Sequence, residues 1–220
     1  MEPFNPILTG DFEMITDYTN ATFKDIFEQA GAGNPKAKAE LDSRFKEKAL
    51  GSGAIPYLQA EAEKGNARAQ NCLGLCHLFE TDNEIGLDPK LGMKWLLRAA
   101  VNGDAEAQST LGTFYMCGVF VDGHPDPNEA VRWYNKAAKQ GNTSAQIKLG
   151  IHYCAQGENR QGAYWLATAA SKSYDAHELL FKVCAKEASL HATIINAVQE
   201  ATRSDAIGGQ QVKTPKSALG

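Results

Sequence analysis

The chain has 220 residues, of which 43% are hydrophobic and 22% are charged, and its formal net charge is −4 at pH 7. This composition is typical of a globular or repeat protein that buries a core without disulfides or metals. The negative charge argues against nucleic-acid binding, which needs a basic surface, and no run of about 18 apolar residues indicates a membrane span.

Residues 1–32 predict an acidic N-terminal extension that ends in a capping helix. The stretch carries six acidic residues against one lysine, and its last part places Phe23 and Phe27 on one helical face. Residues 1–10 lack the basic and apolar regions of a signal peptide. We therefore expect a cytoplasmic protein, although signal-independent secretion would leave the same pattern.

An internal repeat dominates the middle of the chain. The segments GNARAQNCLG, GDAEAQSTLG and GNTSAQIKLG are variants of one another, and they begin 38 residues apart at Gly65, Gly103 and Gly141. Each is followed by a second related segment that contains a tryptophan. These tryptophans are Trp95, Trp133 and Trp165. Such periodicity indicates stacked helical units, none of which buries its apolar face alone.

The predicted repeat boundaries follow these segments. They are 33–64, 65–102, 103–140 and 141–172, with a partial copy at 173–184. The first repeat is degenerate and has Tyr57 in the tryptophan position. The first and fourth repeats are six residues shorter than the other two, which we attribute to the loop between their helices.

Each repeat predicts two helices joined to the next repeat by a capped turn. Apolar residues recur at three- and four-residue steps in both halves, which indicates helices with one buried face. The glycine that begins each repeat lies just past the preceding helix, where a left-handed residue is needed. Asn66, Asp104 and Asn142 follow directly and are suited to cap the next helix. The fold class is therefore all-α.

The C-terminal part predicts a second cap and a tail. Residues 185–209 place Leu190, Ile194 and Val198 on one stripe, which is typical of a C-terminal capping helix that closes a helical array. Residues 210–220 have little to bury, so we expect a disordered tail.

The repeat pattern carries a family resemblance. The pattern resembles the Sel1-like repeat, which has AxAQxxLG, then a loop with glycine, then AxxWYxKAAxxGN. The best copy is Ala105–Gly141. The resemblance covers residues 33–181. It implies a right-handed α-solenoid of antiparallel helix pairs, related to tetratricopeptide repeats, that serves as a bacterial adaptor or scaffold in protein complexes. The five cysteines do not follow the placement of the family's disulfide-paired branch, and we expect them to be reduced.

Motifs for catalysis, cofactors and metals are missing from the sequence. We find no HExxH, GxSxG, GxxxxGK[ST] or GxGxxG, and the five histidines share no helical spacing. We therefore predict that the chain is not an enzyme and has no catalytic, cofactor-binding or metal-binding residues. Some disulfide-rich relatives are credited with weak β-lactam hydrolysis, a remote alternative. SxxK occurs at Ser43–Lys46, without an SDN or KTG partner.

Binding of another protein or peptide is the function that remains. In proteins of this family the first helix of each repeat lines the concave side. First-helix positions that vary between copies share one face and predict a partner-binding strip of charged, hydroxyl and aliphatic groups. The strip residues are Arg68, Asn71, Cys72, Leu75, Glu106, Ser109, Thr110, Thr113, Ser144, Ile147, Lys148 and Ile151. The oligomeric state is left open.

A second binding interpretation uses other surfaces. The chain would then be a bacterial immunity protein, an inhibitor or a secreted effector that binds one specific protein target. Its contacts would be the acidic residues 1–32 and the loops between helices. Phe120, in one of these loops, is the predicted loop contact.

Overall fold

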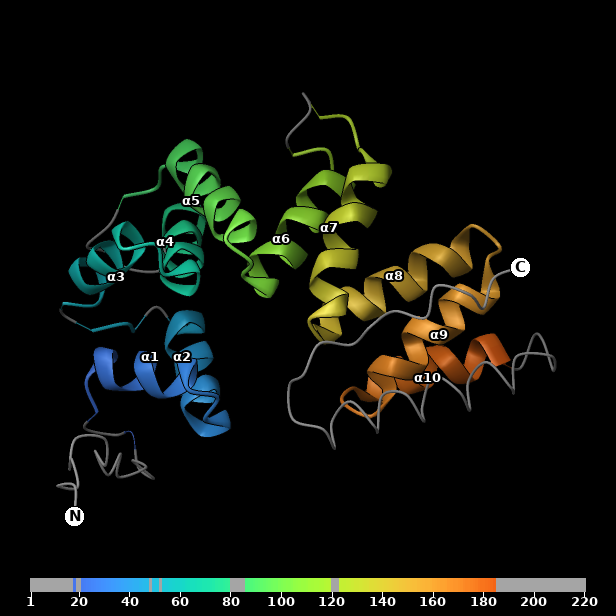
Figure 1. The fold of residues 1–220 in the computed structure, drawn as a ribbon, viewed down its shortest axis with the longest axis horizontal. Helices are drawn as coiled ribbons and strands as arrows, with labels where there is room; N and C mark the ends of the chain where they lie inside the picture. The colour runs from blue at the N-terminus through green and yellow to red at the C-terminus, as the bar shows by residue number, and fades with distance from the viewer. Residues whose placement is uncertain are drawn as a thin grey trace, which may run out of the picture. The chain divides into compact units, whose positions relative to one another are not determined.

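A computed structural model of the chain describes residues 18, 21–47, 49–51, 53–79, 86–119 and 123–184. The prediction of an all-helical fold is confirmed, since these residues form ten helices packed pairwise in repeat fashion (Figure 1). The helices are α1 (Phe23–Gly31), α2 (Pro35–Lys46), α3 (Ala54–Glu63), α4 (Ala67–Phe79), α5 (Pro89–Val101), α6 (Ala105–Met116), α7 (Pro127–Lys139), α8 (Thr143–Ala155), α9 (Asn159–Ala170) and α10 (Tyr174–Cys184). None of these helices is long and apolar enough to span a membrane.

Some sequence predictions concern parts of the chain outside the described residues. The predicted C-terminal capping helix at 185–209 and the predicted tail at 210–220 both lie there, as do residues 1–17 of the N-terminal extension. The end of that extension is described. It forms α1, whose Thr22 and Asp25 cap the helix reciprocally, as a capping box does.

The helices group into two compact units, Met1–Trp95 and Leu96–Gly220, with the boundary inside α5. We call them unit 1 and unit 2. In unit 1, α1 packs against both α2 and α3, and α3 packs against α4. In unit 2, α6, α7, α8 and α9 each pack against the next helix in the chain, which for α9 is α10.

The turn between consecutive repeats has one geometry, seen clearly at Gly103. This glycine has a φ of 96°, which residues with a side chain rarely adopt. Its N–H donates to the Ala100 carbonyl at 3.2 Å, and the Asp104 N–H donates to the Ala99 carbonyl at 3.0 Å. The Asp104 side chain then accepts from the Ala107 N–H at 2.7 Å and caps α6. The same bonds recur at Gly65–Asn66 and Gly141–Asn142. One helix is thus ended and the next begun within two residues.

A buried glutamine side chain adds a second hydrogen bond across each of these turns. Gln108 Nε2 in α6 donates to the Ala100 carbonyl in α5 at 2.9 Å, and Gln108 Oε1 accepts from Gln140 Nε2 at 2.8 Å. Ala100 therefore receives two donors, one from the backbone and one from the glutamine. The glutamine-to-carbonyl bond also joins Gln70 to Ala62 and Gln146 to Ala138. It ties α4, α6 and α8 to the end of the helix before each of them.

Within each repeat the two helices cross at small residues. A Cβ placed on Gly150 of α8 would lie 2.6 Å from Leu166 Cγ and 3.2 Å from the Gly162 carbonyl of α9. A Cβ placed on Gly112 of α6 would lie 2.6 Å from the Tyr134 ring of α7. These glycines let the helices approach closely, as the repeated Leu-Gly pair indicates.

The tryptophan positions contribute to the core unequally. Trp133 of α7 is buried, with 7% of its surface exposed. Trp95 and Trp165 are half-buried and pack at the edges of buried hydrophobic clusters. Tyr57 of α3 occupies the matching position in unit 1 and is also half-buried.

We expect Gln108→Ala to lower the free energy of unfolding by about 1–3 kcal/mol, because a buried carbonyl and the Gln140 amide each lose a partner. Urea unfolding, monitored by circular dichroism, measures this change in the free energy of unfolding. Gln59 is exposed on α3, so Gln59→Ala is the matched control and should change stability by less than about 0.5 kcal/mol. Equal effects of the two substitutions would contradict the role given to the buried glutamine.

Two glycine-to-alanine substitutions should act in opposite directions. Gly150→Ala should destabilise the protein by about 1–3 kcal/mol, since its Cβ meets Leu166 and overpacks the crossing. Gly31→Ala should stabilise it by up to about 1 kcal/mol, because Gly31 is helical and no atom lies within 4 Å of the added Cβ. Melting temperatures of both variants show whether each change stabilises or destabilises the protein. An unchanged melting temperature of Gly150→Ala would contradict the close approach of α8 and α9.

Candidate binding surfaces

The predicted strip residues of unit 1 lie along α4, where two of them are buried. Asn71 and Cys72 each expose 6% of their surface, and Cys72 belongs to the same hydrophobic cluster as Leu58. The expectation that these two side chains are open to a partner is therefore wrong, because α4 turns this part of its surface into the core. Arg68 and Leu75 are half-buried and keep part of their surface accessible.

The predicted strip residues of unit 2 lie on α6 and α8. Ser109 exposes only 4% of its surface, so the expectation that it is accessible is also wrong. The exposed members are Glu106, Ser144 and Ile151, and the half-buried members are Thr110, Thr113, Ile147 and Lys148. We call these seven residues the α6/α8 face.

Lys148 is the central charge of the α6/α8 face. Its Nζ donates to Ser144 Oγ at 2.8 Å and lies 6.0 Å from the centre of the Tyr134 ring. Burial lowers the pKa of the Lys148 ammonium, and the carboxylate of Glu106 counteracts this shift. Thr113 of α6 and Lys148 of α8 both lie against the Tyr134 side chain, which brings these two members of the face near each other.

The threonines of this face are held in place by their own helix. The Thr110 and Thr113 hydroxyls donate to the carbonyls four residues before them at 2.9 and 3.0 Å. Thr113 Oγ1 also accepts from the Tyr134 hydroxyl at 3.3 Å. Their rotamers are therefore fixed before any partner binds, which reduces the entropy lost on binding.

The predicted loop contact Phe120 lies outside the described residues. Its neighbour Val119, the last described residue before it, exposes 57% of its surface. The role proposed for Phe120 stays a prediction.

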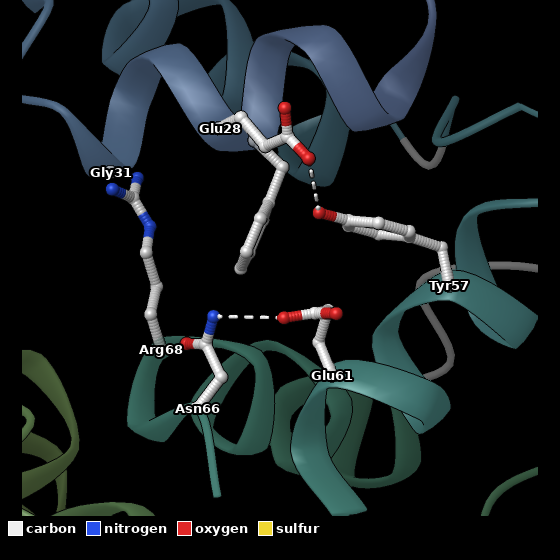
Figure 2. A pocket seen from close by; sticks show the side chains of 7 residues that line it. Glu28, Gly31, Tyr57, Glu61, Asn66 and Arg68 are labelled. Atoms are coloured by element: carbon white, nitrogen blue, oxygen red, sulfur yellow. Dashed lines mark hydrogen bonds between the residues drawn. The ribbon is translucent and has the colours of Figure 1, made fainter. Parts of the chain in front are cut away.

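Unit 1 also contains a cleft of about 520 Å³ between α1, α3 and the start of α4 (Figure 2). It is lined by Phe27, Glu28, Gly31, Tyr57, Glu61, Asn66 and Arg68. Figure 2 shows Glu28 and Tyr57 on one side, with Glu61 and Asn66 across from them. Of the predicted strip, Arg68 alone lines this cleft.

The charges of the cleft act on Tyr57. Its hydroxyl donates to Glu28 Oε1 at 3.3 Å. Burial first, and then the negative charges of Glu28 and Glu61, raise the pKa of Tyr57 to about 12. A hydrogen bond from Lys64 Nζ at 2.7 Å lowers the pKa of Glu61. At neutral pH the cleft therefore holds the protonated phenol of Tyr57 and the ionised carboxylate of Glu61.

Sequence reasoning did not find this cleft because its walls are distant in the chain. Phe27 and Glu28 come from the capping helix α1, whereas Tyr57 and Glu61 come from α3. The available signal was Tyr57 itself, because a tyrosine in a tryptophan position adds a polar group that needs a partner.

Comparison with known proteins gives the same repeat pattern. Residues 67–104, 105–142 and 143–174 each match the Sel1 repeat family, and these segments begin two residues after the predicted repeat boundaries. Comparison with curated proteins finds no match.

Two solved structures resemble the chain. A Sel1 repeat protein from Oxalobacter formigenes is 25% identical with a TM-score of 0.51, over 58% of this chain and 97% of that one. A protective antigen present in uropathogenic Escherichia coli strains, which displays an SLR fold, is 25% identical with a TM-score of 0.58. That match covers 89% of this chain but only 45% of the antigen, so the chain spans less than half of that protein.

We expect the double variant Glu28→Gln/Glu61→Gln to lower the pKa of Tyr57 from about 12 toward the ordinary value of 10.0, leaving the part due to burial. The pH dependence of tyrosinate absorbance, with Tyr57→Phe subtracted, measures it. Glu63→Gln, an exposed change at the end of the same helix, should have no effect. Because the unfolded chain releases this proton first, wild-type stability should fall as the pH rises from about 10 to 12.

Proposed function

This chain belongs to the Sel1 repeat family, with three repeats over residues 67–174, and we propose that it is a non-catalytic module that binds a partner polypeptide. Repeat proteins of this kind stack small helical units, and the face of each first helix that is not needed for stacking is left for binding. The proposed contact surface is the α6/α8 face of unit 2.

The observation that carries this proposal is the position of Ile151 beside Lys148. Ile151 exposes 48% of its surface although it is a large aliphatic residue on a well-packed helix. Lys148, three residues earlier, is partly desolvated already, as the lowered pKa of its ammonium indicates. An apolar group next to a half-desolvated charge that already has ordered partners is typical of protein contact surfaces.

The composition of the face favours a polypeptide over a small molecule. It combines one carboxylate, one ammonium, three hydroxyls and two aliphatic side chains. An amphipathic partner with an acidic group opposite Lys148 and an apolar group against Ile151 matches this arrangement.

The proposal is tested with the full chain as bait in native lysate, followed by affinity measurement with the captured protein. We expect Lys148→Glu/Ile151→Asp to weaken binding by about tenfold or more, since both changes oppose the expected contacts. Lys139→Glu, an exposed charge reversal on α7, should leave binding unchanged.

Circular dichroism of each variant separates lost binding from lost fold. Capture of the same partner with equal affinity by wild type and by the double variant would exclude the α6/α8 face as the contact surface.

A further inference from the structure

The cleft of unit 1 contains charged groups that do not neutralise one another. Glu28 and Glu61 line two of its sides, and Arg68 lines a third (Figure 2). Within the described part of the chain, Arg68 forms no ion pair with either carboxylate. Its guanidinium instead lies over the Phe27 ring, 5.5 Å from the ring centre.

Both carboxylates retain capacity to accept hydrogen bonds. Glu28 accepts from the Tyr57 hydroxyl, and Lys24 lies 3.9 Å away. Glu61 accepts from Lys64 and, at 3.5 Å, from Asn66 Nδ2. Each carboxylate offers about four acceptor sites, so these contacts do not exhaust them. The two lysines are 60% and 70% exposed, and such exposed ion pairs are weak.

The aromatic residues of the cleft suit a flat cation. Phe27 and Tyr57 meet edge to face, with their ring centres 5.8 Å apart. The guanidinium of Arg68 already lies over the Phe27 ring, so Tyr57 is the aromatic residue left to contact a ligand. A guanidinium also matches carboxylates through paired N–H donors, which an ammonium group does not.

We propose that this cleft binds an arginine side chain of a partner polypeptide, with its aliphatic part on Tyr57 and its guanidinium between Glu28 and Glu61. The inference rests on the proposed function, because the ligand is part of a polypeptide, and it adds a second contact surface with a defined chemistry. The cleft volume of about 520 Å³ exceeds that of one side chain, so residues next to the arginine enter it too.

Arg68 then determines which neighbours the arginine has. A second cation near Arg68 is repelled, whereas a carboxylate or a main-chain carbonyl accepts from its N–H groups. The cleft therefore selects a single arginine next to an acidic or neutral residue over a run of basic residues.

The test titrates the full ¹⁵N-labelled chain with the peptide acetyl-Gly-Arg-Gly-amide and follows backbone amide shifts. The matched control peptide carries citrulline in place of arginine, which keeps the shape and removes the charge. We expect saturable shifts at the residues of α1, α3 and the start of α4 with the arginine peptide, and at least tenfold weaker binding of the citrulline peptide.

Variants locate the binding to the two carboxylates. Glu28→Gln/Glu61→Gln should weaken the arginine peptide about tenfold or more, whereas Glu63→Gln, which removes a charge from the same helix outside the cleft, should leave it unchanged. Equal affinity of the arginine and citrulline peptides, shifts confined to other helices, or no shifts at millimolar peptide would each overturn the proposal.

The same titration separates this proposal from the proposed function. The α6/α8 variant Lys148→Glu/Ile151→Asp should bind the arginine peptide as wild type does, since it changes no residue of the cleft. If the chain binds the arginine peptide but captures no partner through the α6/α8 face, the cleft proposal stands and the proposed function fails. If it captures a partner through that face but does not bind the arginine peptide, the proposed function stands and the cleft proposal fails.

Discussion

The architecture depends on how each second helix ends. The last carbonyls of a helix have no partner within it, and an array of short helices would leave many of them buried and unsatisfied. Here the Ala100 carbonyl accepts from the Gly103 N–H and from the Gln108 side chain, and the same pairing occurs at Ala62 and Ala138. Because the glutamine belongs to the next helix, the bond that satisfies one helix also fixes the direction of its successor. The glycine crossings form the other contact of the array, between the two helices of one repeat.

The two candidate surfaces arise where this framework leaves side chains unused. On the α6/α8 face, the Thr110 and Thr113 hydroxyls are bonded to their own helix, and Ile151 exposes 48% of its surface. In unit 1 the cleft exists because α1 packs against α3 beside a tyrosine in a tryptophan position, and the phenol brings Glu28 into the site. The cleft therefore follows from a departure from the strict repeat, whereas the α6/α8 face lies on the first helices of two regular repeats.

The sequence predicted the helix pairs, the capped turns and the family, because each depends on residues close together in the chain. It did not predict that Asn71, Cys72 and Ser109 are buried. Variation between copies identifies positions whose residue type differs from one repeat to the next. Such a residue is still buried where nearby side chains pack over it. The cleft was missed for a related reason, since Phe27 and Tyr57 meet only after α1 has packed against α3. The roles of Gln70, Gln108 and Gln146 could have been inferred, because a buried amide repeated at one position needs a repeated partner.

The glutamine bond has a consequence for how such a chain grows. Its donor lies near the start of one copy and its acceptor near the end of the copy before, so the copies at 65–102 and 103–140 each carry half of two identical joints. A duplicate of either of these two copies can therefore be inserted next to it without a newly evolved join. Lengthening or shortening the loop between the two helices of a copy leaves these joints untouched. Copy number and loop length are thus free to change by gene duplication and deletion, while the joint is inherited intact.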